Sequence, residues 1–561
     1  MTDTPTTFKV TDRRTAKDVV APPRTLGKIL RQVGPGLIIA ANIVGSGELI
    51  MATKTGAEAG AVLLWLILLG CVVKVFVQLE LGRFAISHGE TTLSSLNRVP
   101  GPKVGALNWV VIFWAFMMLA TIGQLGGIVG GVGQALALTV PITGDVQKAV
   151  RIPGENDIRA LADWQLIATG QPPINNTEGL PDPASTDSET LSHTNRRMEW
   201  VKKDLDRLGE TGTTILQLAR AGRELNDDNG NSLVSFATWD DRIWVVIVGL
   251  LTSALLYVGR YNLIEKASVG MVVSFSLITI GNVIALQTTE NYSLSMDTIL
   301  SGLKFGLPAG QGAVVTALAT FGIIGVGATE LVAYPYWCLE KGYAKSTGPR
   351  DDSPGWSERA HGWFKVMKFD AFASMIIYTI ATAAFYLMGV AVLHSDGRNP
   401  EGRRMVSTLA ESYVPIFGNF AGWLFLGGAV AVLYSTYLVA NASNSRMVAD
   451  FLGVIGVTSK DPDSDSRRKV VTVLSTALPL VCVVAYLLFP KPVLLVLIAG
   501  FAQCFMLPVL GFSAMYFRYR ETDKRLTPGK VWDLFLAVSV MALVIAGGYG
   551  IWERISNVLG S

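Results

Sequence analysis

Long apolar runs alternate with short polar connections along almost the whole chain. A run of about 20 apolar residues is the length that a helix needs to cross a bilayer. Because the number of runs is odd, the two termini are expected on opposite sides of the membrane. The pattern predicts an all-α integral membrane protein. Eleven spans are predicted, at residues 33–56, 61–82, 106–139, 242–258, 265–287, 312–339, 370–393, 417–442, 469–489, 492–517 and 531–552.

Polar segments divide the chain into regions around these spans. The leader is long and hydrophilic, and no small-residue cleavage pattern follows a short apolar core, so it is not interpreted as a removable signal peptide. We expect it to remain in the mature chain. The expected regions are a cytoplasmic leader, three spans, a hydrophilic extracytoplasmic insertion, eight further spans and a C-terminal tail, at residues 1–32, 33–140, 141–241, 242–552 and 553–561.

The insertion is strongly acidic. Residues 145–241 contain seventeen acidic and ten basic residues, a net charge of −7. The part from Gln171 to Glu189 is rich in Pro, Ser, Thr, Asn and Asp, which is typical of a loop, and a helical stretch is expected at 191–224. The simplest interpretation is a solvated, partly mobile excursion. A cap over the outer mouth and a partner-binding surface remain alternatives.

Polar residues interrupt the first span at its middle. Gly45, Ser46, Gly47 and Glu48 lie between two apolar halves. Inside hydrocarbon a helix can be broken only where the freed backbone groups face a protein-enclosed cavity, as at the solute sites of transporters. The interruption therefore predicts a transporter.

A similar interruption is predicted in the sixth span. Gly322, Gly325 and Gly327 loosen the helix, Glu330 follows, and Pro335 removes a backbone donor. A break near residues 327–335 is expected. Two interrupted spans indicate a solute site more strongly than one, because their broken ends can face each other.

Composition supports a membrane protein, and charge indicates its orientation. Hydrophobic residues make up 50% of the chain and charged residues 16%, with a mean hydropathy of +0.41, whereas soluble domains are about a quarter charged. A basic leader and cation-rich connections at 341–368, 446–469 and 518–530 place the N-terminus in the cytoplasm and the C-terminus outside. Three arginines within 398–404 oppose this orientation. A bacterial inner membrane is the expected location.

Several classes of function are not supported by the residues present. The net charge of +10 outside the insertion fits membrane orientation and not nucleic-acid binding. Four cysteines and four histidines show no ligand-like spacing at mid-membrane, and the cysteines are assigned to packing. No GxxxxGK[ST] loop is present, so ATP is not expected to drive transport. We expect no enzyme activity and no cofactor, with the lipid bilayer and a small solute as partners.

Several spans resemble the NRAMP divalent-metal transporters. From Gly34-Pro35-Gly36 to Gly60 the spacing is that of the family's first helix, whose motif reads GPG and then DPGN. The triplet Gly327-Ala328-Thr329 is similar to the GAT that precedes MPH in the sixth helix of the family.

Further stretches agree with the same family. Residues 424–452, including Ser435-Thr436, resemble its eighth helix, and Arg260-Tyr261, Glu265 and Asp370 also fit. The resemblance covers residues 30–140 and 245–520 and implies an inverted repeat of the leucine-transporter type. In that fold spans one to five are repeated upside down as six to ten, and spans one and six are broken around the solute.

The resemblance also implies a set of site residues between the two breaks. An alternative for Glu48 is a helix cap, since a carboxylate at a helix N-terminus interacts well with the dipole. Ser46 and Thr329 are expected to satisfy backbone groups first and to act as ligands second. The expected substrate-binding residues are Gly45, Ser46, Glu48, Gly327, Thr329, Glu330 and Leu331, with Glu48 and Glu330 as the metal ligands.

The family's own metal ligands are absent at these positions. Gly45 stands where DPGN has Asp, Glu48 where it has Asn, and Leu331 where MPH has Met. A thioether selects softer transition metals such as iron and manganese, so its loss favours a hard ion such as magnesium. Relatives that lack the methionine are known to favour such ions.

Proton coupling is also not expected. Ionisable positions of the family's proton path are replaced by Gly127, Gly130, Ala333 and Val473. Charges inside a membrane are costly and persist for a function, so their joint absence indicates that the proton route is missing. Transport is expected to be uncoupled or driven by another ion.

Lys74 is an unusual charge deep in the second span. It can pair with Glu330, or it can join helices together with Gln78 one turn away. The second, structural interpretation is favoured. The glycine pairs at 126–127 and 130–131 are expected to permit close helix packing.

Two other functions remain open. The Gly45-Ser46-Gly47 sequence is also similar to the break of amino-acid permeases of this architecture, in which free N–H groups hold a substrate carboxylate. Alternatively, the chain is a non-transporting receptor or scaffold that binds partners through its acidic insertion. Uptake assays with metals and with amino acids distinguish a metal transporter from an amino-acid permease. Removal of the insertion distinguishes a transporter, which should keep its flux, from a receptor or scaffold.

Overall fold

The fold is taken from a computed structural model of the chain. It describes residues 18–175, 177, 180–181, 188–258, 261–308, 311–459, 461 and 464–559. The predictions that rest on the leader before Asp18 and on Arg260 lie outside these residues.

Membrane-spanning helices make up most of the described chain. Ten helical stretches are long and apolar enough to cross a bilayer, and one of them, Pro35–His88, has 54 residues. A single helix of that length would measure about 80 Å, far more than the roughly 30 Å of hydrocarbon. The chain turns at Gly60, whose φ is +61°, so this stretch crosses twice. Eleven crossings result, and the predicted all-α membrane fold is confirmed.

The elements follow the chain in three groups. The first comprises α1 (Leu26–Leu30), α2 (Pro35–Ile43), the π-helix η2 (Ser46–Ala52), α3 (Thr53–Ala59), η3 (Gly60–Leu63), α4 (Leu64–His88), α5 (Thr92–Leu96), the hairpin of β1 (Lys103–Val104) and β2 (Leu107–Asn108), and α6 (Trp109–Thr139). The insertion comprises α7 (Asp145–Ala149), α8 (Glu155–Ala168), α9 (Ser188–Asp206) and α10 (Glu210–Arg220).

The third group completes the bundle. It comprises α11 (Asp240–Val258), α12 (Tyr261–Leu286), α13 (Met296–Ser301), α14 (Gln311–Ile323), α15 (Ala328–Glu340), α16 (Tyr343–Thr347), α17 (Pro354–Met388), η4 (Gly389–His394), η5 (Gly402–Arg404), α18 (Met405–Glu411), α19 (Val414–Phe417), η6 (Gly418–Phe420), α20 (Ala421–Val454), α21 (Asp465–Leu488), α22 (Pro492–Tyr516), η7 (Phe517–Glu521), η8 (Lys524–Leu526) and α23 (Lys530–Leu559).

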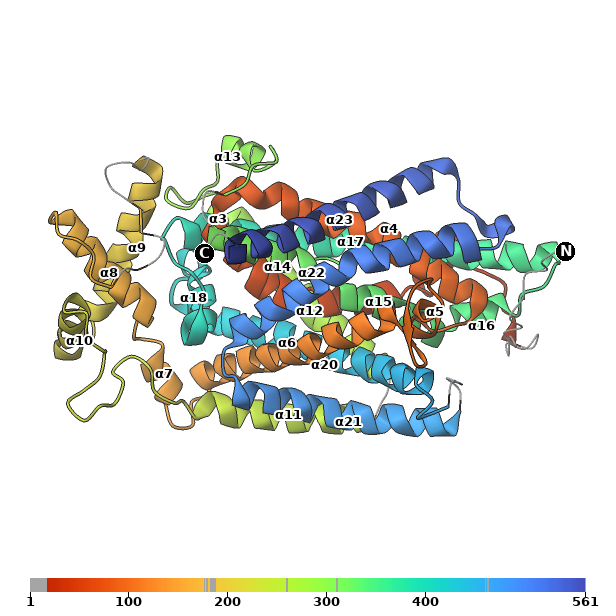
Figure 1. Cartoon of the computed structure of the whole chain (residues 1–561), viewed down its shortest axis with the longest axis horizontal. Coiled ribbons are helices and arrows are strands. Elements are labelled where there is room, and N and C mark those ends of the chain that lie inside the picture. The colour runs from red at the N-terminus through yellow and green to blue at the C-terminus, as the bar shows by residue number, and fades with distance from the viewer. Residues whose placement is uncertain are drawn as a thin grey trace.

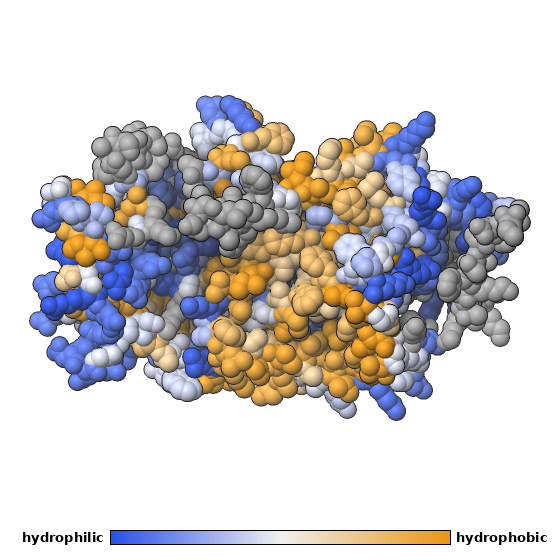
Figure 2. Space-filling view, viewed as in Figure 1, coloured by the Kyte–Doolittle hydropathy of each residue, from blue (hydrophilic) through white to orange (hydrophobic). Residues whose placement is uncertain are grey.

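The helices run along the long axis of the molecule, and the insertion lies beyond one end of the bundle (Figure 1). Helix α6 is central, because α22, α20, α11 and α21 all pack against it. Figure 2 shows a broad apolar band across the middle, with hydrophilic surfaces at both ends. This is the surface pattern of a protein that spans a bilayer.

Several helices extend beyond the predicted spans. Helix α17 begins at Pro354 and not near residue 370, and α23 continues to Leu559, through the expected tail. The apolar run marks only the part of a helix that lies in lipid, and the polar residues outside it continue the same hydrogen-bonded helix. The third span begins at Trp109, because residues 103–108 form the β1–β2 hairpin.

The insertion is helical and has a hydrophobic core of its own, whereas its sequence favoured a solvated, partly mobile excursion. Helices α8, α9 and α10 pack on one another around a core that includes Ile158, Met198 and Ile215. This core was not predicted, because its apolar residues are spread over three helices of mostly polar composition. The predicted helical stretch at 191–224 is two helices, which are separated at Gly209.

Helix α9 docks on the connection between α17 and α20. The guanidinium of Arg398 lies 3.7 Å from the ring centroid of Trp200, and Arg404 forms an ion pair of 2.5 Å with Asp204. These arginines opposed the orientation predicted from charge. Their contacts show that they bind side chains of the acidic insertion.

The same connection holds the second half of the first span. Lys54 of α3 is 3% exposed and lies 2.7 Å from Glu401 and 2.8 Å from the side-chain oxygen of Asn399. Glu58, one turn along α3, also pairs with Lys54 at 2.7 Å. The insertion, the connection and α3 therefore form one continuous set of contacts.

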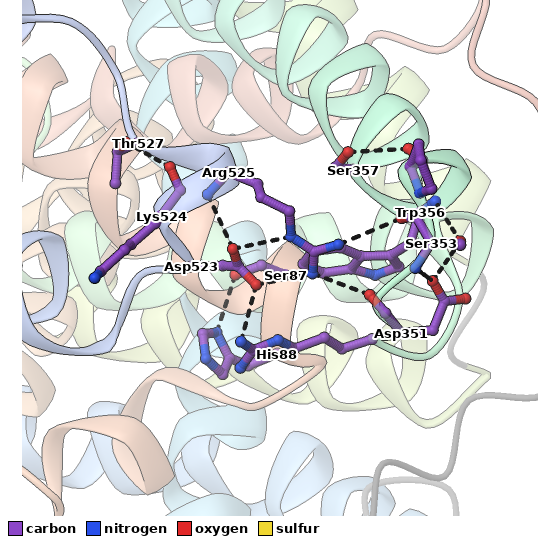
Figure 3. Close-up of polar contacts among 12 residues, drawn as sticks. Ser87, His88, Asp351, Ser353, Trp356, Ser357, Asp523, Lys524, Arg525 and Thr527 are labelled. Atoms are coloured by element: carbon purple, nitrogen blue, oxygen red, sulfur yellow. Dashed lines mark hydrogen bonds and ion pairs between the residues drawn. The ribbon is translucent and has the colours of Figure 1, made fainter.

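At the opposite end, a polar cluster joins η8 to the start of α17 (Figure 3). Arg525 donates to the carbonyls of Asp351 and Ser353, at 3.0 and 3.3 Å, and its guanidinium lies 4.9 Å from the ring of Trp356. Hydrogen bonds from Arg525 lower the pKa of Asp523 to about 2. The charged carboxylate thus fixes the arginine that connects the two segments.

Candidate functional site

The first span is broken where the sequence predicted it. Helix α2 ends at Ile43, the chain leaves helical geometry at Val44 and Gly45, and η2 begins at Ser46. Gly45 lies directly against Thr436 of α20, where a Cβ atom at position 45 would collide with the threonine side chain. The glycine is therefore required by close packing at the break.

The sixth span is also broken, at residues 324–327. Helix α14 ends at Ile323, Gly325 has a φ of +57°, and α15 begins at Ala328. The break thus lies at the start of the predicted range 327–335, and Pro335 lies inside the continuous helix α15. The left-handed backbone of Gly325, which residues with a side chain rarely adopt, ends the helix first.

Two buried charges satisfy the broken ends. Glu48 accepts hydrogen bonds from the backbone N–H groups of Gly45, at 3.4 Å, and of Gly325, at 3.3 Å. The Thr382 hydroxyl lies 3.2 Å from the same carboxylate. Lys74 donates to the carbonyls of Phe321 and Ile324 at the end of α14. One carboxylate thus joins both breaks, and one ammonium caps the sixth span.

A small cavity lies between the two breaks. Its free volume is about 20 Å³, enough for one or two water-sized particles. Oxygen and amide groups make up much of its wall. The lining residues are Asn42, Ile43, Ser46, Gly47, Thr121, Gln124, Leu125, Ile128, Ile323, Thr329, Glu330, Thr436 and Ala440.

Glu330 is the carboxylate that faces this cavity. It is partly exposed, whereas Ser46 and Thr329 are buried. The Asn42 amide donates to Glu330 at 2.7 Å. The Asn42 Oδ1 atom is buried and has no hydrogen-bond partner among the described residues. An unsatisfied buried oxygen beside a carboxylate is an arrangement that a cation would complete.

A chain of amides connects the two breaks across the bundle. Gln503 of α22 accepts from the N–H of Thr329 at 3.2 Å and donates to Gln124 of α6 at 2.8 Å. Gln124 in turn donates to the Ser46 hydroxyl at 3.2 Å. The Thr121 and Thr329 hydroxyls lie 3.2 Å apart. These bonds orient the oxygens around the cavity.

The motif Gly34-Pro35-Gly36 fixes the start of α2. Asp370 of α17 accepts from the N–H groups of Gly34, at 3.1 Å, and Gly36, at 2.5 Å. A Cβ atom at position 36 would lie 2.8 Å from the Asp370 carbonyl oxygen. The carboxylate at the helix N-terminus also interacts favourably with the dipole. The motif therefore anchors the first span to the seventh.

The predicted site residues divide into two groups. Ser46, Thr329 and Glu330 line the cavity. Glu48 contacts both breaks from outside the lining, where its carboxylate acts as the cap that the sequence allowed as an alternative. The remaining predicted residues also lie outside the lining: Gly45, Gly327 and Leu331.

Other polar residues of the site were missed from the sequence. Asn42, Gln124, Gln503 and Thr436 were not predicted, although all lie at or beside the cavity. Single amides inside apolar runs were the available signal, because such groups in lipid need partners.

The neutral residues at the family's proton-path positions lie in different environments. Gly127 and Gly130 permit close packing against Pro492 and Tyr486, and Val473 is 65% exposed on the outer surface. Val473 therefore lines no internal path. Buried ionisable groups do occur elsewhere: Arg467 of α21 pairs with Asp450 of α20 at 2.9 Å, and Arg83 pairs with Glu80 within α4.

Comparison with protein families places these features in context. Residues 231–553 match the family described as natural resistance-associated macrophage protein-like. "Metal transporter Nramp2" of Oryza sativa subsp. japonica is 32% identical over 136 residues, which is 23% of this chain and 24% of that protein. The chain thus aligns with about a quarter of the length of this curated relative.

Solved structures of a transporter are similar in fold to nearly the whole chain. Two mutants of the manganese transporter of Eremococcus coleocola give TM-scores of 0.57 and 0.53 at 12% identity, and each comparison covers 97% of this chain and 91% of that one. At this identity the likeness shows the fold alone. The fold is that of this transporter, and its first and sixth spans are broken as predicted.

Proposed function

The chain belongs to the natural resistance-associated macrophage protein-like family, and from this premise we propose that it is a secondary transporter of a divalent metal cation. The protein is an integral, multi-pass membrane protein. The observation that carries the proposal is the oxygen-lined cavity between the two helix breaks.

Four side chains supply the proposed ligands. They are Glu330, the Asn42 amide oxygen and the hydroxyls of Ser46 and Thr329. All are hard oxygen donors, and Leu331 takes the place of the family's methionine. Such a set favours magnesium over iron or manganese. Magnesium demands an octahedral shell and usually keeps some of its waters, so these protein oxygens would supply only part of that shell.

The chemistry of the cavity also weighs against the main alternative. Among the described residues, the lining between the breaks offers a carboxylate and several oxygens but no basic side chain to pair with a substrate carboxylate. In addition, the N–H of Gly45 donates to Glu48, so it is not free for a substrate carboxylate. An amino-acid substrate therefore has less support than a cation.

Transport without proton coupling is part of the proposal. The family's proton-path positions are neutral at Gly127, Gly130 and Ala333, and both glycines are used for close packing. We also propose a bacterial inner membrane, with the basic end of the bundle in the cytoplasm and the acidic insertion outside.

Uptake by purified protein in liposomes tests the substrate. Magnesium and manganese uptake should exceed that of empty liposomes, while a labelled amino-acid mixture should not accumulate. Accumulation of amino acids with no metal uptake would contradict the proposal. Absence of flux for every solute would favour the receptor or scaffold alternative.

Two matched carboxylate substitutions test the site. Glu330→Gln should weaken metal affinity about tenfold or more, because loss of a charged ligand costs about 1.5–3 kcal/mol, and should leave the thermal stability of the metal-free protein nearly unchanged. Glu48→Gln should lower both flux and thermal stability, because an amide cannot accept at both Gly45 and Gly325 as well as a carboxylate does. Metal titration followed by thermal unfolding gives both readings. Unchanged metal affinity in Glu330→Gln would remove that residue from the site.

A further inference from the structure

Lys74 is a fully buried cation in the middle of α4, and its ammonium lies at the end of the broken helix α14. Its exposure is 0%. The ammonium donates to the Phe321 carbonyl and, at 2.8 Å, to the Ile324 carbonyl. It also lies 4.7 Å from the ring centroid of Phe321, which adds a cation–π attraction.

The break in the sixth span creates the oxygens that Lys74 binds. In an unbroken helix the Phe321 carbonyl would accept from the N–H of residue 325, but the N–H of Gly325 donates to Glu48 instead. The end of α14 thus presents free carbonyls with the negative end of the helix dipole behind them. This end attracts a cation.

Free carbonyls at the C-terminal ends of half-helices are the groups with which ion-driven carriers of this architecture coordinate their coupling cation. We propose that the Lys74 ammonium permanently occupies a monovalent-cation position at the end of α14, so that the transport cycle runs without a coupling ion. The proposal deepens the transporter function above and rests on it. It also gives a physical reason for uncoupled transport.

Packing around the break leaves little space for a second ion there. Gly325 approaches the backbone of α4 so closely that a Cβ atom would lie 2.8 Å from the Cys71 Cα. A Cβ atom at Gly70 would lie 3.0 Å from the Ile324 side chain. Lys74 lies one turn further along the same face of α4. The lysine stem and its ammonium therefore fill the position themselves.

A helix cap and a tethered cation predict different behaviour when the charge is removed. Lys74→Gln keeps a hydrogen-bond donor without the charge, and Lys74→Met keeps much of the stem without either. If hydrogen bonding alone matters, Lys74→Gln should resemble the wild type. If the position requires a cation, both variants should gain a site that sodium fills.

Thermal unfolding of the full-length protein in detergent gives a readout that does not need transport. Wild type and Lys74→Arg should unfold at the same temperature in NaCl and in N-methyl-D-glucamine chloride. Lys74→Met and Lys74→Gln should unfold at lower temperature, and sodium should raise the midpoint saturably, by about 2 °C or more. Lys368→Met, at a half-buried lysine near Trp532, is the matched control and should show no sodium effect.

Two results would overturn the proposal. The first is no difference between the two salts for either neutral variant. The second is an equal sodium effect in wild type. A saturable sodium effect confined to the two neutral variants supports it.

In liposomes, metal uptake by wild type should not depend on a sodium gradient, whereas uptake by Lys74→Gln should. If metal uptake is absent in all proteins while the unfolding result holds, the transporter proposal fails and the cation position stands.

Discussion

Single residues set how closely the spans approach at the two breaks. Gly45 contacts Thr436 with no space for a Cβ atom, while Gly47 in the same break would place a Cβ atom 3.3 Å from the Ile323 carbonyl oxygen, a milder contact. The sequence showed that this segment would be broken, because glycines and a carboxylate interrupt an apolar run. It did not show which glycine is required by packing.

Gly45→Ala should destabilise the protein more than Gly47→Ala. Overpacking of this kind costs about 1–3 kcal/mol, and the displaced α20 should also reduce metal uptake. Adding Thr436→Gly should restore part of both losses by removing the obstructing side chain. Thermal unfolding and liposome uptake of the three variants provide the check. Equal effects of the two alanine substitutions would contradict this view of Gly45.

Helix α9 contacts the membrane domain through a face that includes a pair of histidines. The ring centroids of His193 and His394 lie 4.7 Å apart. Burial, together with the nearby charges of His394, Arg196 and Arg197, lowers the pKa of His193 to about 4. At neutral pH His193 is therefore uncharged, and its protonation opposes docking.

Docking of α9 should weaken as the pH falls below about 6.5, the ordinary pKa of histidine. Between that pH and 4 the released helix binds a proton that the docked one does not, so the stabilisation is complete above pH 6.5 and is lost towards pH 4. Distances between spin labels on α10 and α23 would report release. His193→Gln should flatten this dependence, and an unchanged profile in that variant would contradict the assignment. Asp163, whose pKa is lowered from 3.8, acts only at more acidic pH.

At the scale of the whole molecule, the insertion and the bundle are joined at a closed base. Asp240 accepts from the N–H groups of Thr143 and Gly144 at 2.6 and 2.8 Å, and Asp145 accepts from that of Trp239 at 2.5 Å. The chain therefore leaves and re-enters the bundle at neighbouring points. The cavity between the breaks is lined entirely by residues of the bundle.

Replacing residues 150–235 with a short flexible linker should leave metal uptake within about twofold of the full chain, because no cavity ligand is removed and the contacts at the base remain. Uptake in liposomes at neutral pH, normalised to the folded protein, measures this. Complete loss of uptake in a folded deletion variant would instead assign the insertion to the transport site itself.

The sequence determined the features that depend on local composition. Apolar runs of bilayer length fixed the eleven crossings, since lipid excludes unpaired backbone, and Gly-Ser-Gly in the first span fixed the position of one break. In the sixth span the same reasoning extended the predicted break as far as Pro335. A proline is nevertheless tolerated within a helix whose packing keeps it intact. Gly325 ended the helix earlier by its positive φ.

Tertiary structure alone decided which groups meet across the bundle. Glu48, Lys74 and Glu330 are all charges within apolar spans, and nothing local distinguishes a cap from a ligand. Their roles follow from partners far along the chain: Glu48 reaches Gly325, Lys74 reaches Ile324, and Glu330 meets Asn42. A buried charge is stable only where distant backbone or side-chain groups compensate it, and the folded arrangement alone brings these groups within hydrogen-bonding distance.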